Sequence, residues 1–197
     1  MSSDRETLDY YNGSAEKYAG VFSRSEPDQD LSAFMNSVVN GGRVLDLGCG
    51  PGNSAAMMVA AGFDVDASDA SQGMADLAKE KFDLDVKIET FDDLDAVDLY
   101  DGIWANFSLL HAPRAEMPKH LRSIKQALKT DGVFHLGLKL GDRDIRDRLG
   151  RFYTHYTEAE LLGLLSEAGF QVSNIRHGHG KGMAGTDDPF IIILSHA

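Results

Sequence analysis

The chain of 197 residues contains a single cysteine, so it can form no internal disulfide bond. A chain of this length buries roughly 70% of its unfolded surface and needs neither disulfides nor a structural metal to fold. Its apolar runs are also short, far below the roughly 20 residues that a membrane helix requires. The polar N-terminus lacks the apolar region of a signal peptide. We therefore expect a soluble protein located in the cytoplasm.

Basic residues are scarce: the chain contains 19 Lys and Arg but 31 Asp and Glu, which gives a formal net charge of −12. A field of this sign repels the phosphates of nucleic acids and the anionic surface of a membrane. We therefore expect neither nucleic acid nor membrane as a partner. The length suits one domain over residues 1–197. We expect this domain to function as a monomer or a homodimer.

Strand-like runs alternate with helical patterns along most of the chain. The predicted strands are residues 43–47, 63–68, 85–90, 99–105 and 133–138, and the predicted helices are residues 53–61, 71–82, 113–128 and 157–169. Residues 129–132 are predicted to form a turn. Such alternation predicts an α/β fold, with a mostly parallel sheet and helices on both of its faces.

The two ends of the chain depart from this alternation. Residues 170–175 and 189–194 are predicted strands that only a glycine-rich loop separates, which indicates an antiparallel hairpin at the sheet edge. The first 40 residues are predicted to form two helices that cover a core of residues 41–197.

The loop Asp46-Leu-Gly-Cys-Gly-Pro-Gly52 joins the first strand to the helix that follows it. Open α/β sheets bind ligands beyond the carboxyl ends of their strands. Glycines let the backbone turn sharply and let a ligand approach it, and the next helix presents free N–H groups. A dinucleotide fingerprint would need glycine where Asn53 stands. This mismatch disfavours a nicotinamide-dependent oxidoreductase but leaves it as an alternative.

The pattern Asp46-x-Gly48-x-Gly50-x-Gly52 resembles the first motif of class I S-adenosylmethionine-dependent methyltransferases. The segment from Asp64 to Met74 is similar to the next part of that family, in which a strand ends on an acid and leads into a helix. Residues 10–18, 128–134 and 156–170 are also similar to family segments. The resemblance therefore covers nearly the whole chain and includes small methyltransferases of the tellurite-resistance type.

This resemblance implies a Rossmann-like, seven-stranded sheet with S-adenosyl-L-methionine as cofactor. The family pattern places Asp46 at the cofactor's amino group and Asp69 at its ribose hydroxyls. Near the adenine many members carry an acid followed by a small residue, but this chain departs from them with Thr90-Phe91-Asp92-Asp93. We expect Phe91 on the adenine ring and Asp92 at its exocyclic amine. The cofactor-binding residues that it implies are Tyr11, Tyr18, Asp46, Gly48, Gly50, Gly52, Asp69, Ala70, Met74, Phe91, Asp92 and Asn106. The implied activity is in-line methyl transfer without a metal. A non-catalytic cofactor binder or sensor is the other alternative.

Little of the chain lies outside the core, which favours a small-molecule acceptor, with oxyanions such as tellurite as one class. The segment from Lys139 to Tyr156 is expected to line the acceptor pocket. Its arginines form either a solvated helix face or a contact to an anionic acceptor. His111 is the first candidate for a general base, because histidine titrates near neutral pH, and Tyr153 or His155 comes next. Packing at the rim of the pocket is the alternative role for His111.

Two further patterns have plainer interpretations. Cys49 lies between glycines and has no adjacent base, so we expect a buried packing residue and not a nucleophile. His177 and His179 are two histidines without a nearby third ligand, so we expect a solvated hairpin loop and not a metal site.

Overall fold

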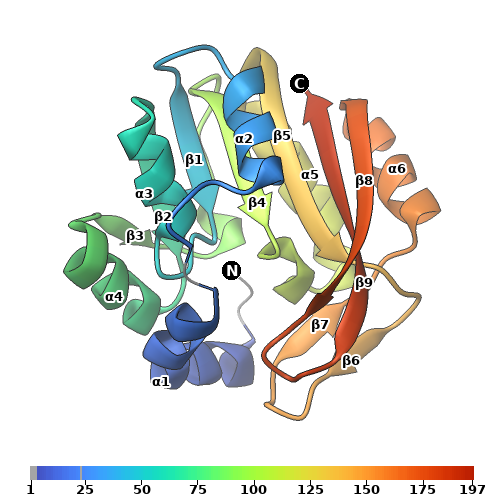
Figure 1. Ribbon diagram of the computed structural model, residues 1–197. Helices are drawn as coiled ribbons and strands as arrows, with labels where there is room; N and C mark the ends of the chain where they lie inside the picture. The colour runs from blue at the N-terminus through green and yellow to red at the C-terminus, as the bar shows by residue number, and fades with distance from the viewer. Residues whose placement is uncertain (1–3, 23) are drawn as a thin grey trace.

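A seven-stranded sheet forms the centre of the computed structural model, which describes residues 4–22 and 24–197 (Figure 1). The strand order is β3-β2-β1-β4-β5-β9-β8. Neighbours from β3 to β5 run parallel, whereas β9 is antiparallel to both β5 and β8. The strands are β1 Arg43–Leu47, β2 Asp64–Asp69, β3 Val86–Ile88, β4 Tyr100–Asn106, β5 Leu128–Lys139, β8 Gln171–Lys181 and β9 Asp187–His196. The predicted fold class is thus confirmed.

Helices cover both faces of this sheet. The helices are α1 Arg5–Phe22, α2 Gln29–Ser37, α3 Asn53–Ala60, α4 Gln72–Phe82, α5 Met117–Ala127 and α6 Glu158–Glu167. One apolar core joins α2 and α3 to the sheet through residues such as Phe34, Met58 and Trp104. A larger core lies under α5 and α6 and includes Leu121, Ile124 and Leu165. None of the helices in the described ranges has the length and apolar character to cross a membrane.

Local sequence signals explain where several helices begin. The Ser71 side chain caps α4 and accepts a hydrogen bond from the Met74 backbone N–H at 3.3 Å. Thr157 and Glu160 form a capping box at the start of α6. Such caps satisfy backbone N–H groups that the first helical turn leaves without partners. The starts of α4 and α6 that these residues predict are confirmed, whereas α6 ends at Glu167 and not at residue 169.

Helix α1 lies beside the carboxyl ends of the strands because it is tied to α4. The side-chain oxygen of Asn12 accepts hydrogen bonds from the Ser71 hydroxyl at 2.8 Å and from the Gly73 backbone N–H at 3.2 Å. A Cβ at Gly73 would lie 2.6 Å from the Asn12 carbonyl oxygen, so glycine permits this close approach. The two helices therefore meet at the sheet edge where a ligand is expected.

Two local predictions are wrong. Residues 129–132 belong to β5 and form an irregularity in its pairing with β4, where Asp131 has a φ of 61°. The glycine-rich segment is largely paired: β8 extends to Lys181, so His177 and His179 lie in a strand and not in a loop. Gly178 permits this pairing, since a Cβ there would lie 2.4 Å from the Phe190 ring.

The segment after β5 is also not helical. It forms a small antiparallel pair, β6 Asp144–Arg146 and β7 Phe152–Thr154. The interpretation of its arginines as a solvated helix face is therefore wrong. Arg151 instead lies buried, and its guanidinium donates to the Asp147 carboxylate at 2.6 and 3.0 Å.

Candidate active site

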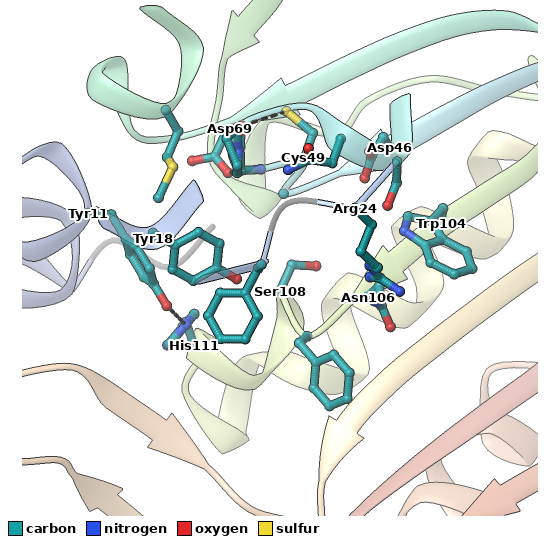
Figure 2. Close-up of a pocket in the computed structure, with 18 residues that line it drawn as sticks. Tyr11, Tyr18, Arg24, Asp46, Cys49, Asp69, Trp104, Asn106, Ser108 and His111 are labelled. Carbon is teal, nitrogen blue, oxygen red and sulfur yellow. Dashed lines mark hydrogen bonds between the residues drawn. The ribbon is translucent and has the colours of Figure 1, made fainter. Parts of the chain in front are cut away.

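A pocket lies at the carboxyl ends of β1, β2 and β4, and residues of α1 form one of its sides (Figure 2). It contains the predicted residues Tyr11, Tyr18, Asp46, Gly48, Gly50, Asp69, Met74, Asn106 and His111. It also contains residues that were not predicted to bind a ligand: Phe22, Arg24, Cys49, Pro51, Asn53, Ser54, Trp104, Phe107 and Ser108. The loop motif and the N-terminal helix, which are distant in sequence, thus share one site.

Asp46 is the most unusual group in this pocket. Its side chain is buried, and the oxygen Oδ2 has no hydrogen-bond partner among the described residues. Burial, together with the nearby charge of Asp69, raises the pKa of the Asp46 carboxyl to about 8. An unpaired buried oxygen costs free energy, which a ligand that donates a hydrogen bond would recover. The carboxyl therefore suits a cationic or N–H group of a ligand.

Asp69 lies at the end of β2 and holds the glycine loop. One oxygen accepts from the Gly50 backbone N–H and the other from the Ser71 backbone N–H, each at 2.9 Å. Burial raises the pKa of this carboxyl above its ordinary value. The Asp69 side chain is fully buried. Its carboxylate both shapes the loop and lines the pocket.

Each of the three glycines of the motif is required for a different structural reason. A Cβ at Gly48 would lie 2.4 Å from the side chain of Ser108, whose hydroxyl donates to the Leu47 carbonyl at 2.6 Å. A Cβ at Gly52 would contact side chains of α4 and the following loop at 2.9–3.0 Å. Gly50 faces open space, since its nearest atom belongs to the Tyr18 ring at 4.0 Å. Gly50 is thus the position where a ligand can approach the backbone.

Several predicted residues lie outside the pocket lining. Gly52 and Ala70 are not part of it. Phe91 is buried in the core edge-on to His120, with 5.5 Å between ring centroids. Asp92 forms an ion pair with Lys119 at 2.6 Å. The structure therefore does not place these four residues in the lining of the pocket. The adenine contacts predicted for Phe91 and Asp92 stay predictions.

A second cavity of about 320 Å³ adjoins the first. The two share Tyr11, Tyr18, Phe22, Arg24, Asn106, Phe107 and His111. The second extends between β7 and the β8–β9 hairpin, where Tyr153, Arg151 and Lys139 line it. His155 does not line either cavity. The segment after β5 thus contributes to this cavity, as predicted, but through fewer residues.

His111 lies at the boundary of the two cavities. Its Nδ1 is 2.6 Å from the Phe152 carbonyl oxygen, and its Nε2 is 2.8 Å from the Tyr11 hydroxyl. Burial, which disfavours the charged ring, lowers the pKa of His111 to about 3. The expectation that His111 titrates near neutral pH is therefore wrong. At physiological pH the ring is neutral.

A hydrogen bond to the buried His135 orients the Asn106 side chain. Its side-chain oxygen lies 3.1 Å from His135 Nε2, and the His135 ring stacks on Trp104 with 3.6 Å between centroids. Burial lowers the pKa of His135 to about 3, so this ring is also neutral.

Within the described residues, no group of three or more His, Cys, Asp or Glu side chains converges as a metal site would require.

Comparisons with known proteins agree with this geometry. A family model described as a methyltransferase domain matches residues 44–132. An uncharacterized methyltransferase of Staphylococcus carnosus (strain TM300) is 32% identical over 122 residues, which are 61% of this chain and 56% of that protein. A demethylmenaquinone methyltransferase of Clavibacter sepedonicus is 35% identical over 95 residues, 44% of this chain and 38% of that protein. The matches thus span about half or less of these curated relatives.

Solved structures share the fold over most of the chain. The 1,6-didemethyltoxoflavin-N1-methyltransferase of Burkholderia thailandensis, with 1,6-didemethyltoxoflavin and S-adenosylhomocysteine bound, has a TM-score of 0.77 at 21% identity, covering 100% of this chain and 91% of that one. TehB from Haemophilus influenzae has a TM-score of 0.72 at 18% identity, covering 92% and 66%. At these identities the likeness shows the fold.

The chain has the fold of class I S-adenosylmethionine-dependent methyltransferases. Residues 44–132, which begin within β1 and contain the loop Asp46–Gly52, match the family model of a methyltransferase domain. The family resemblance of this loop is confirmed.

Proposed function

We propose that the chain binds S-adenosyl-L-methionine in the pocket at Asp46 and transfers its methyl group to a small molecule in the adjoining cavity. The observation that carries this proposal is the buried, unpaired Oδ2 of Asp46 beside the open face of Gly50. The cofactor's ammonium group would donate to this oxygen. Asp69 already accepts two backbone N–H groups, but a carboxylate has further acceptor sites for ribose hydroxyls.

The cofactor supplies a methyl group that its sulfonium already activates for displacement. The chain's own task is therefore to hold the acceptor in line and to exclude water. Tyr11, Tyr18 and Phe107 line both cavities and can form the wall across which the two molecules meet. This arrangement supports one methyltransferase domain over residues 1–197, with residues 1–40 as its cover.

A small-molecule acceptor is supported by the size and the lining of the second cavity. Its volume of about 320 Å³ and its aromatic residues Tyr153 and Phe190 suit a compact, partly apolar molecule. The Burkholderia thailandensis 1,6-didemethyltoxoflavin-N1-methyltransferase, whose fold this chain shares, has 1,6-didemethyltoxoflavin bound. Cytoplasmic location and a monomeric or homodimeric state stay predictions.

Turnover with a panel of acceptors tests this function. The protein is incubated with S-adenosylmethionine and phenols, amides, amines, thiols, carboxylic acids or oxyanions, and release of S-adenosylhomocysteine is measured. We expect turnover with at least one class, its loss in Asp46→Asn, and its retention in Asp76→Asn. Asp76 is the matched control, because it is an exposed acid of α4 outside both cavities. Cofactor binding without turnover of any acceptor would instead indicate a non-catalytic binder.

A further inference from the structure

Tyr11 and His111 line both cavities. Figure 2 shows the hydrogen bond that joins their side chains. We propose that the Tyr11 hydroxyl takes a proton from the methyl acceptor while it passes its own proton to His111 Nε2. The acceptor then carries an O–H or an amide-like N–H at its reacting atom. This inference rests on the proposed methyl transfer and names its acceptor class and proton path.

The hydrogen bonds set the direction of this relay. The Phe152 carbonyl oxygen can only accept, so the Nδ1 atom at 2.6 Å carries the proton of the neutral His111 ring. Nε2 therefore has a free lone pair, and the Tyr11 hydroxyl at 2.8 Å donates to it. Arg151 donates to the same hydroxyl at 3.3 Å. The Arg151 contact, and a side-chain hydrogen bond between the Tyr11 and Tyr153 hydroxyls, surround the Tyr11 oxygen on the side away from His111. The cation favours loss of the Tyr11 proton to Nε2, and this loss is what lets the oxygen take up the acceptor's proton in the same step.

The groups around the pair keep it uncharged at rest. Tyr153 packs on His111 with 4.7 Å between centroids, and the cations Arg151 and Lys139 lie on the same side. Burial and these cations lower the pKa of His111, while burial raises the pKa of Tyr11 well above its ordinary value. The relay therefore begins as a neutral phenol and a neutral imidazole at any physiological pH.

The proposed step balances in atoms and charge. The acceptor atom forms its bond to the methyl carbon as the carbon–sulfur bond breaks, and that electron pair stays on sulfur. The acceptor's proton moves to Tyr11, and the proton of Tyr11 moves to Nε2. The positive charge lost from sulfur thus reappears on the imidazole, which releases its proton to water after the product leaves.

The need to remove a proton from the reacting atom defines the acceptor class. A hydroxyl or amide-like N–H becomes a much stronger acid than an imidazolium once methylation begins, so even a weak base removes its proton. A methylated amine keeps its proton without cost, and a thiolate or an oxyanion has no proton to lose. The relay therefore benefits hydroxyl and amide-like acceptors.

The tautomer of His111 can be measured without an acceptor. Protein labelled with 15N-histidine is saturated with S-adenosylhomocysteine, and the His111 signals are assigned by their absence in His111→Gln. We expect a neutral ring with its proton on Nδ1 from pH 5 to pH 9, and a shift of the Nε2 signal in Tyr11→Phe. A proton on Nε2, or titration between pH 6 and 7, would overturn the relay.

Kinetics then test the acceptor class. For hydroxyl or amide-like acceptors we expect Tyr11→Phe to lower kcat by about 10²–10⁴-fold, while KM and S-adenosylhomocysteine affinity change little. Tyr10→Phe is the matched control, because this neighbouring hydroxyl is buried, lines neither cavity and has no hydrogen-bond partner among the described residues. It should keep kcat within about twofold.

Two kinetic results would contradict the relay. One is full kcat in Tyr11→Phe with a hydroxyl acceptor, and the other is a panel in which hydroxyl and amide-like acceptors all fail. In both cases S-adenosylhomocysteine would still bind. Loss of that binding in the unmodified chain would instead contradict the proposed function itself.

Discussion

The affinity for S-adenosylhomocysteine should depend on pH through Asp46. The pKa of this carboxyl in the free protein is about 8, so at pH 7 about nine-tenths of the molecules carry it protonated. Binding of the ligand's ammonium group requires the ionised form. Each binding event at pH 7 should therefore release about 0.9 proton. Below pH 7 the affinity should fall about tenfold per pH unit, or about 1.4 kcal/mol.

Isothermal titration calorimetry at pH 5.5, 6.5 and 7.5 measures both quantities. Two buffers with different ionisation enthalpies give the number of protons released. Asp46→Asn should bind more weakly, without pH dependence and without release of this proton. Asp76→Asn should keep the behaviour of the unmodified chain, since its side chain lies outside the pocket. Constant affinity between pH 5.5 and 7.5 with no proton release would refute the role of Asp46.

The same carboxyl should also link stability to pH. Its folded pKa is raised, so the folded state binds the proton more tightly than the unfolded state. Its favourable contribution is complete below the unfolded pKa of about 3.9 and is lost as pH rises through about 8. Asp46→Asn should therefore melt at a higher temperature than the unmodified chain at pH 8.5. This difference should shrink toward pH 4, and a constant difference would contradict the shifted pKa.

Two pairs of glycine substitutions distinguish effects on ligand binding from effects on stability. Gly50→Ala and Gly62→Ala both place a Cβ at a positive φ, and each should cost roughly 1 kcal/mol in urea unfolding. Only Gly50→Ala should also weaken S-adenosylhomocysteine, and equal affinity in both variants would contradict the approach of ligand to Gly50. Gly163→Ala should raise the free energy of unfolding by up to about 1 kcal/mol, because Gly163 lies in α6 and a Cβ there meets open space. Gly102→Ala should cost about 1–3 kcal/mol, because its Cβ would lie 2.7–2.8 Å from Val38 and Phe34, and neither change should alter ligand affinity.

Local chemistry explains why much of the fold could be predicted from the sequence. The α/β alternation follows from hydrophobic periodicity, and the starts of α4 and α6 follow from Ser71 and Thr157, whose side chains act within three residues. The glycine loop could be predicted for the same reason, because its acid and its glycines lie close together in the chain. Such features require no knowledge of the rest of the molecule.

Long-range pairing explains what could not be predicted. Residues 144–146 and 152–154 become strands only because they pair with each other across a short loop, and His177 enters a strand because Ile191 pairs with it. The titration of His111 likewise depends on burial by Tyr11 and Tyr153, which come from distant segments. No pattern near His111 in the sequence carries this information.

The melting temperature with S-adenosylhomocysteine and with NAD tests the cofactor site most directly. A ligand that binds only the native state at 100 times its dissociation constant stabilises it by about 2.7 kcal/mol. The pocket at Asp46 and Gly50 predicts a saturable rise in melting temperature with S-adenosylhomocysteine and none with NAD. No rise at millimolar S-adenosylhomocysteine, together with a clear rise from NAD, would contradict the proposed methyltransferase.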